Sequence, residues 1–232
     1  SSDLTAVAER LFAGLGFDLV TVGNTPDGRN INERCGSTHP EMLAEVVLRN
    51  RCQAGVAFDG DGDRAIFVDD QGKVVDGDAV MLLCAKHMKA EGRLKGNAVV
   101  ATVMSNIGLE IALRDAGIAL VRCAVGDKYV MEEMQRQDLA LGGEQSGHII
   151  FSDYLFTGDG LGTALQVLRT IMESGRELDD LASELQTFPQ VLVNVKVPER
   201  RELREIPEVA ALLSSIEERL AGHGRLLVRY SG

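Results

Sequence analysis

The stretch that decides the fold runs from residue 55 to residue 68 and reads GVAFDGDGDRAIFV. Two short apolar runs, residues 55–58 and 65–68, flank an acidic loop with glycine at alternate positions. Apolar runs of this length, bounded by turn residues, predict strands, and glycine permits a tight backbone between them. The stretch therefore predicts two strands joined by a loop that carries three carboxylates.

Helical and β-rich patterns alternate on both sides of this stretch. Upstream lie a predicted helix at 4–13, a strand at 17–22 and a helix at 40–51, and downstream a strand at 73–75 closes a hairpin. This alternation is typical of an α/β domain with a mostly parallel sheet and crossover helices. We place the boundary of this first domain at residue 76.

A second cycle of the same kind begins at residue 77. Its predicted elements are helices at 79–89, 107–116, 129–137, 160–173 and 178–185, and strands at 98–102, 118–123 and 139–141. The fold class is therefore α/β, with two consecutive mixed, mostly parallel sheet domains, residues 1–76 and 77–188. Residues 189–232 predict a strand at 191–197, a helix at 209–220 and a strand at 226–229, which we interpret as the start of a third, α+β domain. Because 232 residues begin within a helix and stop at a turn, we expect a part of a longer protein.

Composition excludes several classes of function. The sequence is 45% hydrophobic and 25% charged, and it lacks an apolar run of the about 18 residues that a membrane span needs. A net charge of -11 disfavours nucleic acid and anionic membranes as partners. Four cysteines without CxxC spacing indicate free thiols in a reducing compartment. With no signal segment visible, we expect a cytoplasmic protein.

Asp59, Asp61 and Asp63 occupy every second position of the acidic loop. Such spacing can direct three oxygens to one ion, and an all-oxygen set favours Mg²⁺. An EF-hand would need glycine at the position of Arg64, glutamate at the position of Asp70, and flanking helices. A phosphatase of the haloacid dehalogenase type, with its first aspartate as nucleophile, stays open as an alternative.

Three further motifs carry groups that suit a phosphorylated sugar. Residues 142–148 read GGEQSGH, in which Glu144 and Ser146 could bind hydroxyl groups and His148 could transfer a proton. Residues 126–129 read GDKY at a predicted strand-to-helix junction, where a helix N-terminus and a lysine can receive an anion. Residues 229–232, RYSG, could begin a phosphate-binding loop.

These four motifs, in this order along the chain, resemble those of the α-D-phosphohexomutases. The resemblance runs from end to end, and Gln145 and residues 30–39 resemble the branch of the family that acts on glucosamine phosphates. It implies four domains around one cleft, of which this chain matches most of the second, the third and the start of the fourth. It also implies interconversion of glucosamine 6-phosphate and glucosamine 1-phosphate for cell-wall precursor synthesis, through a phosphoserine and a bisphosphate intermediate.

The resemblance also implies a role for each site residue. Asp59, Asp61 and Asp63 would hold Mg²⁺, and Arg64 would lie beside the transferring phosphate. The residues implied to bind substrate or transfer protons are Lys128 and His148 for catalysis, and Asp127, Glu144, Ser146, Arg229 and Ser231 for binding. The full-length parent would form a homodimer.

One family motif has no counterpart in this chain. The nucleophilic serine lies in a Thr-Ala-Ser-His-Asn-Pro loop in the family, and that sequence does not occur here. We therefore expect the chain alone not to catalyse the reaction. A phosphomannomutase/phosphoglucomutase of the same family, a Mg²⁺-dependent phosphatase and a non-catalytic phosphosugar-binding module are the alternatives.

The acidic loop generates a first prediction. Replacing Asp61 by alanine should weaken Mg²⁺ binding markedly, because one of three clustered carboxylates is lost. Isothermal titration calorimetry with MgCl₂ measures the change. An unchanged affinity would remove Asp61 from the ligand set.

Overall fold

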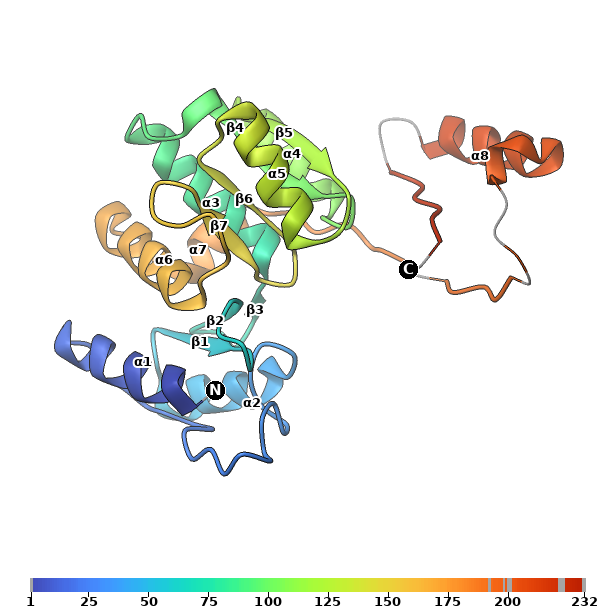
Figure 1. Ribbon diagram of the computed structural model, residues 1–232. Helices are drawn as coiled ribbons and strands as arrows, with labels where there is room; N and C mark the ends of the chain where they lie inside the picture. The colour runs from blue at the N-terminus through green and yellow to red at the C-terminus, as the bar shows by residue number, and fades with distance from the viewer. Residues whose placement is uncertain (1, 192, 198, 200–201, 221–223, 231–232) are drawn as a thin grey trace. The chain divides into compact units, whose positions relative to one another are not determined.

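The computed structural model describes residues 2–191, 193–197, 199, 202–220 and 224–230 (Figure 1). The chain divides into two compact units, residues 1–186 and residues 187–232. The boundary predicted at residue 76 falls inside the first unit, so a separate first domain stays a prediction.

The N-terminal part of the first unit contains two helices and a small sheet. The elements are α1 (Ser2–Gly14), α2 (Pro40–Asn50), β1 (Ala54–Phe58), β2 (Ala65–Asp69) and β3 (Val74–Val75). The strand order is β1-β2-β3. Helix α2 covers one face, where Leu43 and Val47 pack with Ala57 and Val68. A Cβ on Gly55 would lie 2.7 Å from Val47, so glycine lets this helix approach the sheet closely.

The predicted hairpin of residues 65–68 and 73–75 is present, since β2 pairs antiparallel with β3. Two other expectations for this part were wrong. The sheet is not mostly parallel, because β1 also pairs antiparallel with β2, and the loop of residues 59–64 between them is too short for a parallel crossover. Residues 17–22 form no strand. Their β-favouring composition does not suffice, because a strand also needs a neighbour to pair with.

A second sheet forms the centre of the first unit, and its order is β5-β4-β6-β7. Its strands are β4 (Ala98–Thr102), β5 (Ala119–Cys123), β6 (Leu141–Gly143) and β7 (Ile149–Phe151). Its helices are α3 (Gly77–Ala90), α4 (Ile107–Asp115), α5 (Asp127–Gln137), α6 (Gly160–Ser174) and α7 (Leu178–Ser183), with the 3-10 turn η1 (Lys95–Asn97). Strands β5 and β6 are parallel to β4, and β7 is antiparallel to β6. The α/β class and the mixed sheet are thus confirmed.

Helices lie on both faces of this sheet (Figure 1). In β4, Val99 and Ala101 point into the larger core with α3, α4, α6 and α7, whereas Ala98 and Val100 point toward Val130 and Met134 of α5. This alternation is the period of two expected for a strand buried on both faces. The larger core also takes in Phe67 and Val75 of the first sheet, so one apolar core joins the two sheets.

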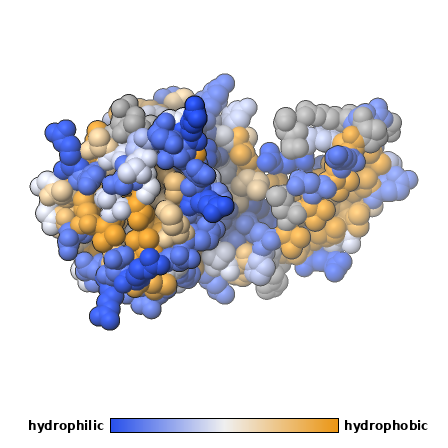
Figure 2. Space-filling view, turned by 90° about the horizontal axis from the view of Figure 1, so that it is seen from below, coloured by the Kyte–Doolittle hydropathy of each residue, from blue (hydrophilic) through white to orange (hydrophobic). Residues whose placement is uncertain are grey.

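The second unit has few buried side chains among its described residues. It contains η2 (Leu203–Glu205) and α8 (Pro207–Leu220), and Leu213 is its buried hydrophobic residue there. Val191, Val193 and Val195 are 89%, 72% and 75% exposed, and a broad apolar area covers this unit at the right of Figure 2.

The strands predicted at 191–197 and 226–229 are not formed in the described part of these segments. The described residues supply no neighbouring strand for either, so their backbone groups have no ladder to join.

Among the helices of the described residues, none has the length and apolar character that a membrane span requires.

The central core generates a stability prediction. Leu109 of α4 is fully buried, so Leu109→Ala should lower the free energy of unfolding by about 2–5 kcal/mol through lost burial and a cavity. Met172→Ala on exposed α6 surface is the control and should change it by less than about 0.5 kcal/mol. Urea denaturation measures both, and equal effects would contradict the described packing.

Candidate functional site

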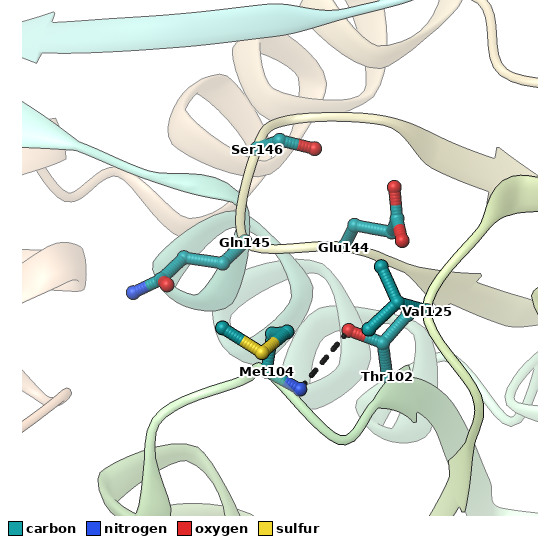
Figure 3. Close-up of a pocket in the computed structure, with 6 residues that line it drawn as sticks. All are labelled: Thr102, Met104, Val125, Glu144, Gln145 and Ser146. Carbon is teal, nitrogen blue, oxygen red and sulfur yellow. Dashed lines mark hydrogen bonds between the residues drawn. The ribbon is translucent and has the colours of Figure 1, made fainter. Parts of the chain in front are cut away.

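A hollow lies beyond the carboxyl ends of the parallel strands of the second sheet. Thr102 ends β4, Val125 follows β5 and Glu144 follows β6. Together with Met104, Gln145 and Ser146 they line a hollow of about 320 Å³ (Figure 3). Ligands of open α/β sheets bind at this edge, so the sheet topology alone marks this hollow as a candidate site.

Residues 144–148 connect β6 to β7 as a tight turn. Glu144 N–H donates to the His148 carbonyl at 2.9 Å, and Gly147 N–H donates to the Glu144 carbonyl at 3.0 Å. Gly147 has φ +94°, and a Cβ there would lie 2.5 Å from the Ala65 carbonyl oxygen. The strand predicted at 139–141 is shifted to 141–143, so the first two glycines of the motif end β6 and only Gly147 shapes the turn.

Glu144 joins this turn to the GDKY motif. Its carboxylate accepts a hydrogen bond from Gly126 N–H at 3.0 Å, and Gly126 is the N-cap of α5. In Figure 3 the side chains of Glu144 and Ser146 point to the same side of the turn. Asp127 and Lys128 are exposed, and Lys128 Nζ lies 3.7 Å from Glu132 Oε1. The structure thus brings the sugar motif and the anion motif together.

The acidic loop is organised by Asp59. Its Oδ1 accepts hydrogen bonds from Gly62 N–H at 2.9 Å and Arg64 N–H at 3.3 Å. Arg64 Nε lies 3.5 Å from Asp59 Oδ2 and 3.9 Å from Asp63 Oδ1. The glycines between the aspartates therefore let one carboxylate fold the loop around itself.

The environment of the Asp63 carboxyl suits a bound cation. Burial raises the pKa of its carboxyl, and Asp59 raises it further, whereas His148 and Arg64 lower it. Its Oδ1 is buried and has no hydrogen-bond partner among the described residues. A buried, unpartnered carboxylate oxygen beside a second carboxylate is costly unless a positive charge neutralises it. Asp59 and Asp63 therefore fit a hard divalent cation.

Asp61 does not join this pair in the structure. It is exposed, and within the described part of the chain only His87, Glu91 and Glu173 bring three ligand atoms within 4.8 Å of one another. The expected convergence of all three aspartates is therefore not seen. The physical reason is that the hydrogen bonds from Gly62 N–H and Arg64 N–H to Asp59 curl the loop. In a curled loop, unlike an extended one, side chains at every second position need not point to the same side. Asp61 as a ligand stays a prediction.

The acidic loop and the sugar motif meet directly, although they lie far apart in the sequence. Arg64 and His148 form an antiparallel bridge, and Ala65 N–H donates to the Gly147 carbonyl at 3.1 Å. His148 is only 3% exposed, and its Nε2 lies 3.6 Å from Asp63 Oδ2. His148 thus contacts the acidic loop and does not line the hollow.

Sequence reasoning missed Asp78 and Arg122, which bond the backbone of residues 102–106, the segment that contributes Thr102 and Met104 to the hollow. Asp78, buried in the first turn of α3, accepts a hydrogen bond from Asn106 N–H at 2.7 Å. Arg122 donates to the carbonyls of Thr102 at 3.2 Å and Ser105 at 3.4 Å. An aspartate at a helix start is indistinguishable from an ordinary cap in sequence, so the pattern held no separate signal for Asp78.

The RYSG motif lies in the second unit. Arg229 is exposed there, and Ser231 lies outside the described residues. Their predicted role in binding phosphate stays a prediction.

A mixed α/β sheet with a hollow at the carboxyl ends of its parallel strands defines the class of α/β proteins whose ligands bind at that edge. Residues 76–188 match phosphoglucomutase/phosphomannomutase alpha/beta/alpha domain III, and residues 192–232 match the C-terminal domain of the same family. The chain belongs to the α-D-phosphohexomutase family.

Individual relatives agree with this assignment. The chain is 54% identical over 226 residues to the phosphoglucosamine mutase of Solibacter usitatus (strain Ellin6076), covering 97% of this chain and 51% of the relative. It therefore spans about half the length of the curated relatives that it matches.

Two solved structures show the same fold. A phosphoglucomutase/phosphomannomutase family protein from Burkholderia thailandensis superimposes with a TM-score of 0.69 at 28% identity, covering 79% of this chain and 40% of that one. The N-acetylphosphoglucosamine mutase of Aspergillus fumigatus, solved with GlcNAc-6P and magnesium, gives a TM-score of 0.67 at 21% identity, covering 88% and 52%.

Asp78 generates a pH prediction. Burial raises the pKa of its carboxyl from 3.8 to about 6, so the folded state holds this proton more tightly than the unfolded state. The contribution of Asp78 to stability should therefore fall as pH rises from about 4 to about 6, by about 3 kcal/mol in total. In Asp78→Asn the new side-chain amide does not titrate but still accepts from Asn106 N–H. The free energy of unfolding of this variant should therefore not fall through this group as pH rises. Urea denaturation from pH 4 to pH 7 measures the difference, and parallel profiles would contradict it.

Proposed function

We propose that this chain supplies the metal-binding and sugar-binding parts of a phosphoglucosamine mutase, which interconverts glucosamine 6-phosphate and glucosamine 1-phosphate. The observation that supports the proposal is the junction of Arg64 with His148, which brings the acidic loop against the turn that carries Glu144 and Ser146. Relatives that are 50–54% identical and named phosphoglucosamine mutase support the choice of substrate.

The domain assignment is part of the proposal. Residues 1–76 correspond to the second domain of the family, residues 77–188 to the third and residues 189–232 to the start of the fourth. The matches to domain III at 76–188 and to the C-terminal domain at 192–232 support these limits.

The hollow binds the sugar. Glu144 and Ser146 point to the same side of the turn, where they accept and donate hydrogen bonds to neighbouring hydroxyl groups of one ring (Figure 3). The start of α5, with Asp127 and Lys128, faces a phosphate, because a helix N-terminus favours an anion. Lys128 is the candidate for proton transfer at the sugar.

The acidic loop binds Mg²⁺ through Asp59, Asp61 and Asp63. When bound, the ion would neutralise charge on a transferring phosphoryl group, which contributes strongly to the rate of such reactions. Arg64 lies beside the same phosphate and adds a second positive charge. His148, buried against Asp63, orients that carboxylate and so acts on the reaction through the acidic loop.

The proposed setting follows from the same reasoning. The enzyme works in the cytoplasm, where its sugar phosphate substrates occur, and the net charge of -11 opposes nucleic acid and anionic membrane partners. A homodimer of the full-length parent is part of the proposal.

A Mg²⁺-dependent phosphatase is the second candidate, and one observation disfavours it. A nucleophilic aspartate must present a free oxygen to phosphorus, yet Asp59 Oδ1 accepts two backbone hydrogen bonds and Oδ2 lies 3.5 Å from Arg64. We therefore assign Asp59 the roles of a metal ligand and a loop organiser.

Calorimetry with glucosamine 6-phosphate and Mg²⁺ tests the proposal. Glu144→Gln keeps the size of the side chain and the acceptor for Gly126, but it removes the charge that strengthens hydrogen bonds to hydroxyl groups. We expect binding to weaken about tenfold, since a charged hydrogen bond contributes about 1.5–3 kcal/mol.

Asp115→Asn, a matched change of an exposed carboxylate on α4, is the control and should leave affinity unchanged. Equal affinity of the Glu144 variant and the unchanged chain would remove Glu144 from the sugar site. Titration with mannose 6-phosphate and glucose 6-phosphate separates this proposal from a phosphomannomutase/phosphoglucomutase, which would bind either of these at least as tightly.

A further inference from the structure

Gln145 and Asp76 form a hydrogen bond across 69 residues of sequence, and the proposed function gives it no role. We propose that this pair is a latch that seats residues 144–147 on the first turn of α3 and thereby sets the position of Glu144 and Ser146 in the hollow. Gln145 is then a positioning residue that determines sugar affinity without contacting the sugar. The consequence for sugar binding rests on the proposed function.

Two hydrogen bonds tie Gln145 to the start of α3. Its Nε2 donates to Asp76 Oδ2 at 3.0 Å, and its carbonyl accepts from Gly77 N–H at 3.0 Å. Side chain and backbone of one residue are thus held by two neighbouring residues at the start of α3. This fixes both the position and the direction of the turn.

The turn lies directly on the helix. A Cβ at Gly77 would come within 2.0 Å of the Glu144 carbonyl oxygen and 2.9 Å of Gly147 N. Glycine at residue 77 therefore lets the backbone of the turn touch the backbone of α3. A small displacement of the turn would therefore move Glu144, whose carboxylate accepts a hydrogen bond from Gly126 N–H.

The latch is one of two anchors on the same turn. On its other side, the Gly147 carbonyl accepts from Ala65 N–H, and His148 bridges to Arg64. Residues 64–65 lie at the start of β2 and residues 76–77 follow β3, so the two anchors flank the β2–β3 hairpin. The bridge to Arg64 aligns the turn with the acidic loop, and the latch sets its tilt on α3.

The direction of the side chains indicates that Gln145 positions the turn and does not itself contact the sugar. Gln145 is among the residues that line the hollow, but in Figure 3 its side chain points away from those of Glu144 and Ser146, and its amide donates to Asp76 just before α3. The hydrogen bond of Gln145 to Asp76 holds its side chain on the opposite side of the turn from those of Glu144 and Ser146. The latch therefore serves the two residues proposed to hold hydroxyl groups.

Asp76 also caps α3, and the variants that test the latch must retain this cap. Its Oδ1 accepts from Asp78 N–H at 3.1 Å and Ala79 N–H at 3.2 Å, which caps α3. Asp76→Ser keeps a capping hydroxyl but is too short to reach Gln145. Asp76→Asn keeps the cap, and its amide can bond Gln145 once the Gln145 amide turns over.

Four variants isolate the latch. Gln145→Met keeps the length and bulk of the side chain but removes its hydrogen bonds, and Asp76→Ser removes the partner. Asp76→Asn is the rescue variant. Gln135→Met, on the exposed surface of α5, is the matched control.

Amide hydrogen exchange, followed by NMR, is the first measurement and needs no ligand. Exchange at Gly77 and Gly147 should be about fivefold faster or more in Gln145→Met and Asp76→Ser, because opening of the turn costs less free energy. Asp76→Asn and Gln135→Met should match the unchanged chain in exchange and in urea midpoint. The double variant should match either single variant, since both remove one interaction. Unchanged exchange at Gly77 and Gly147 would overturn the latch.

Calorimetry with glucosamine 6-phosphate is the second measurement. Gln145→Met and Asp76→Ser should weaken binding by the same factor, with recovery in Asp76→Asn. Weaker binding in Gln145→Met alone, with unchanged exchange, would show that Gln145 contacts the sugar and would overturn the proposal. If the unchanged chain bound no sugar phosphate, the proposed function would fail, while the exchange data would still decide whether the latch exists.

Discussion

The structure of the candidate site depends on one junction, where the backbone of Arg64 and Ala65 meets the backbone of Gly147 and His148. Hydrogen bonds there join the end of the acidic loop to the turn after β6. Without them the two motifs would be separate surface loops on different sheets. Gly147 makes the junction possible, because any Cβ at this position would strike the Ala65 carbonyl. The shared apolar core beneath the two sheets keeps both partners in register.

Charge in the site is arranged around this junction. Asp59 is satisfied by backbone amides and Arg64, whereas Asp63 keeps a buried oxygen without a hydrogen-bond partner among the described residues. Burial and the neighbouring Asp59 raise the pKa of Asp63, an arrangement of two carboxylates that a divalent cation would suit. On the other side of the turn, Glu144 is held by Gly126 and faces an open hollow. One side of the junction therefore attracts a cation and the other offers hydrogen bonds to a polar ligand.

Most of the secondary structure of residues 40–183 could be predicted from local pattern, since α3, α6 and β4 differ from the expected limits by two residues or fewer. The failures have a common cause. Residues 17–22, 191–197 and 226–229 have the composition of strands, but pairing depends on a neighbour that local pattern does not describe. In the first sheet the β2–β3 hairpin was predicted, whereas the antiparallel pairing of β1 with β2 was not, although the short loop of residues 59–64 excludes a parallel crossover. In the site, the turn that bears Glu144 and Ser146 was predicted because a glycine-rich polar segment after a strand is visible in sequence.

The sequence by itself determined which chemical groups this protein carries and on which kind of element each lies. Three aspartates between two apolar runs, a carboxylate and a hydroxyl on a glycine-rich turn, and a family resemblance were all readable from residue order. Only the tertiary structure decided which of these groups meet. It paired Asp59 with Asp63 and left Asp61 exposed, turned His148 toward the acidic loop, and brought Asp76 to Gln145. The reason is physical: local pattern determines burial and element type, whereas contacts between distant residues depend on how the elements pack around a shared core.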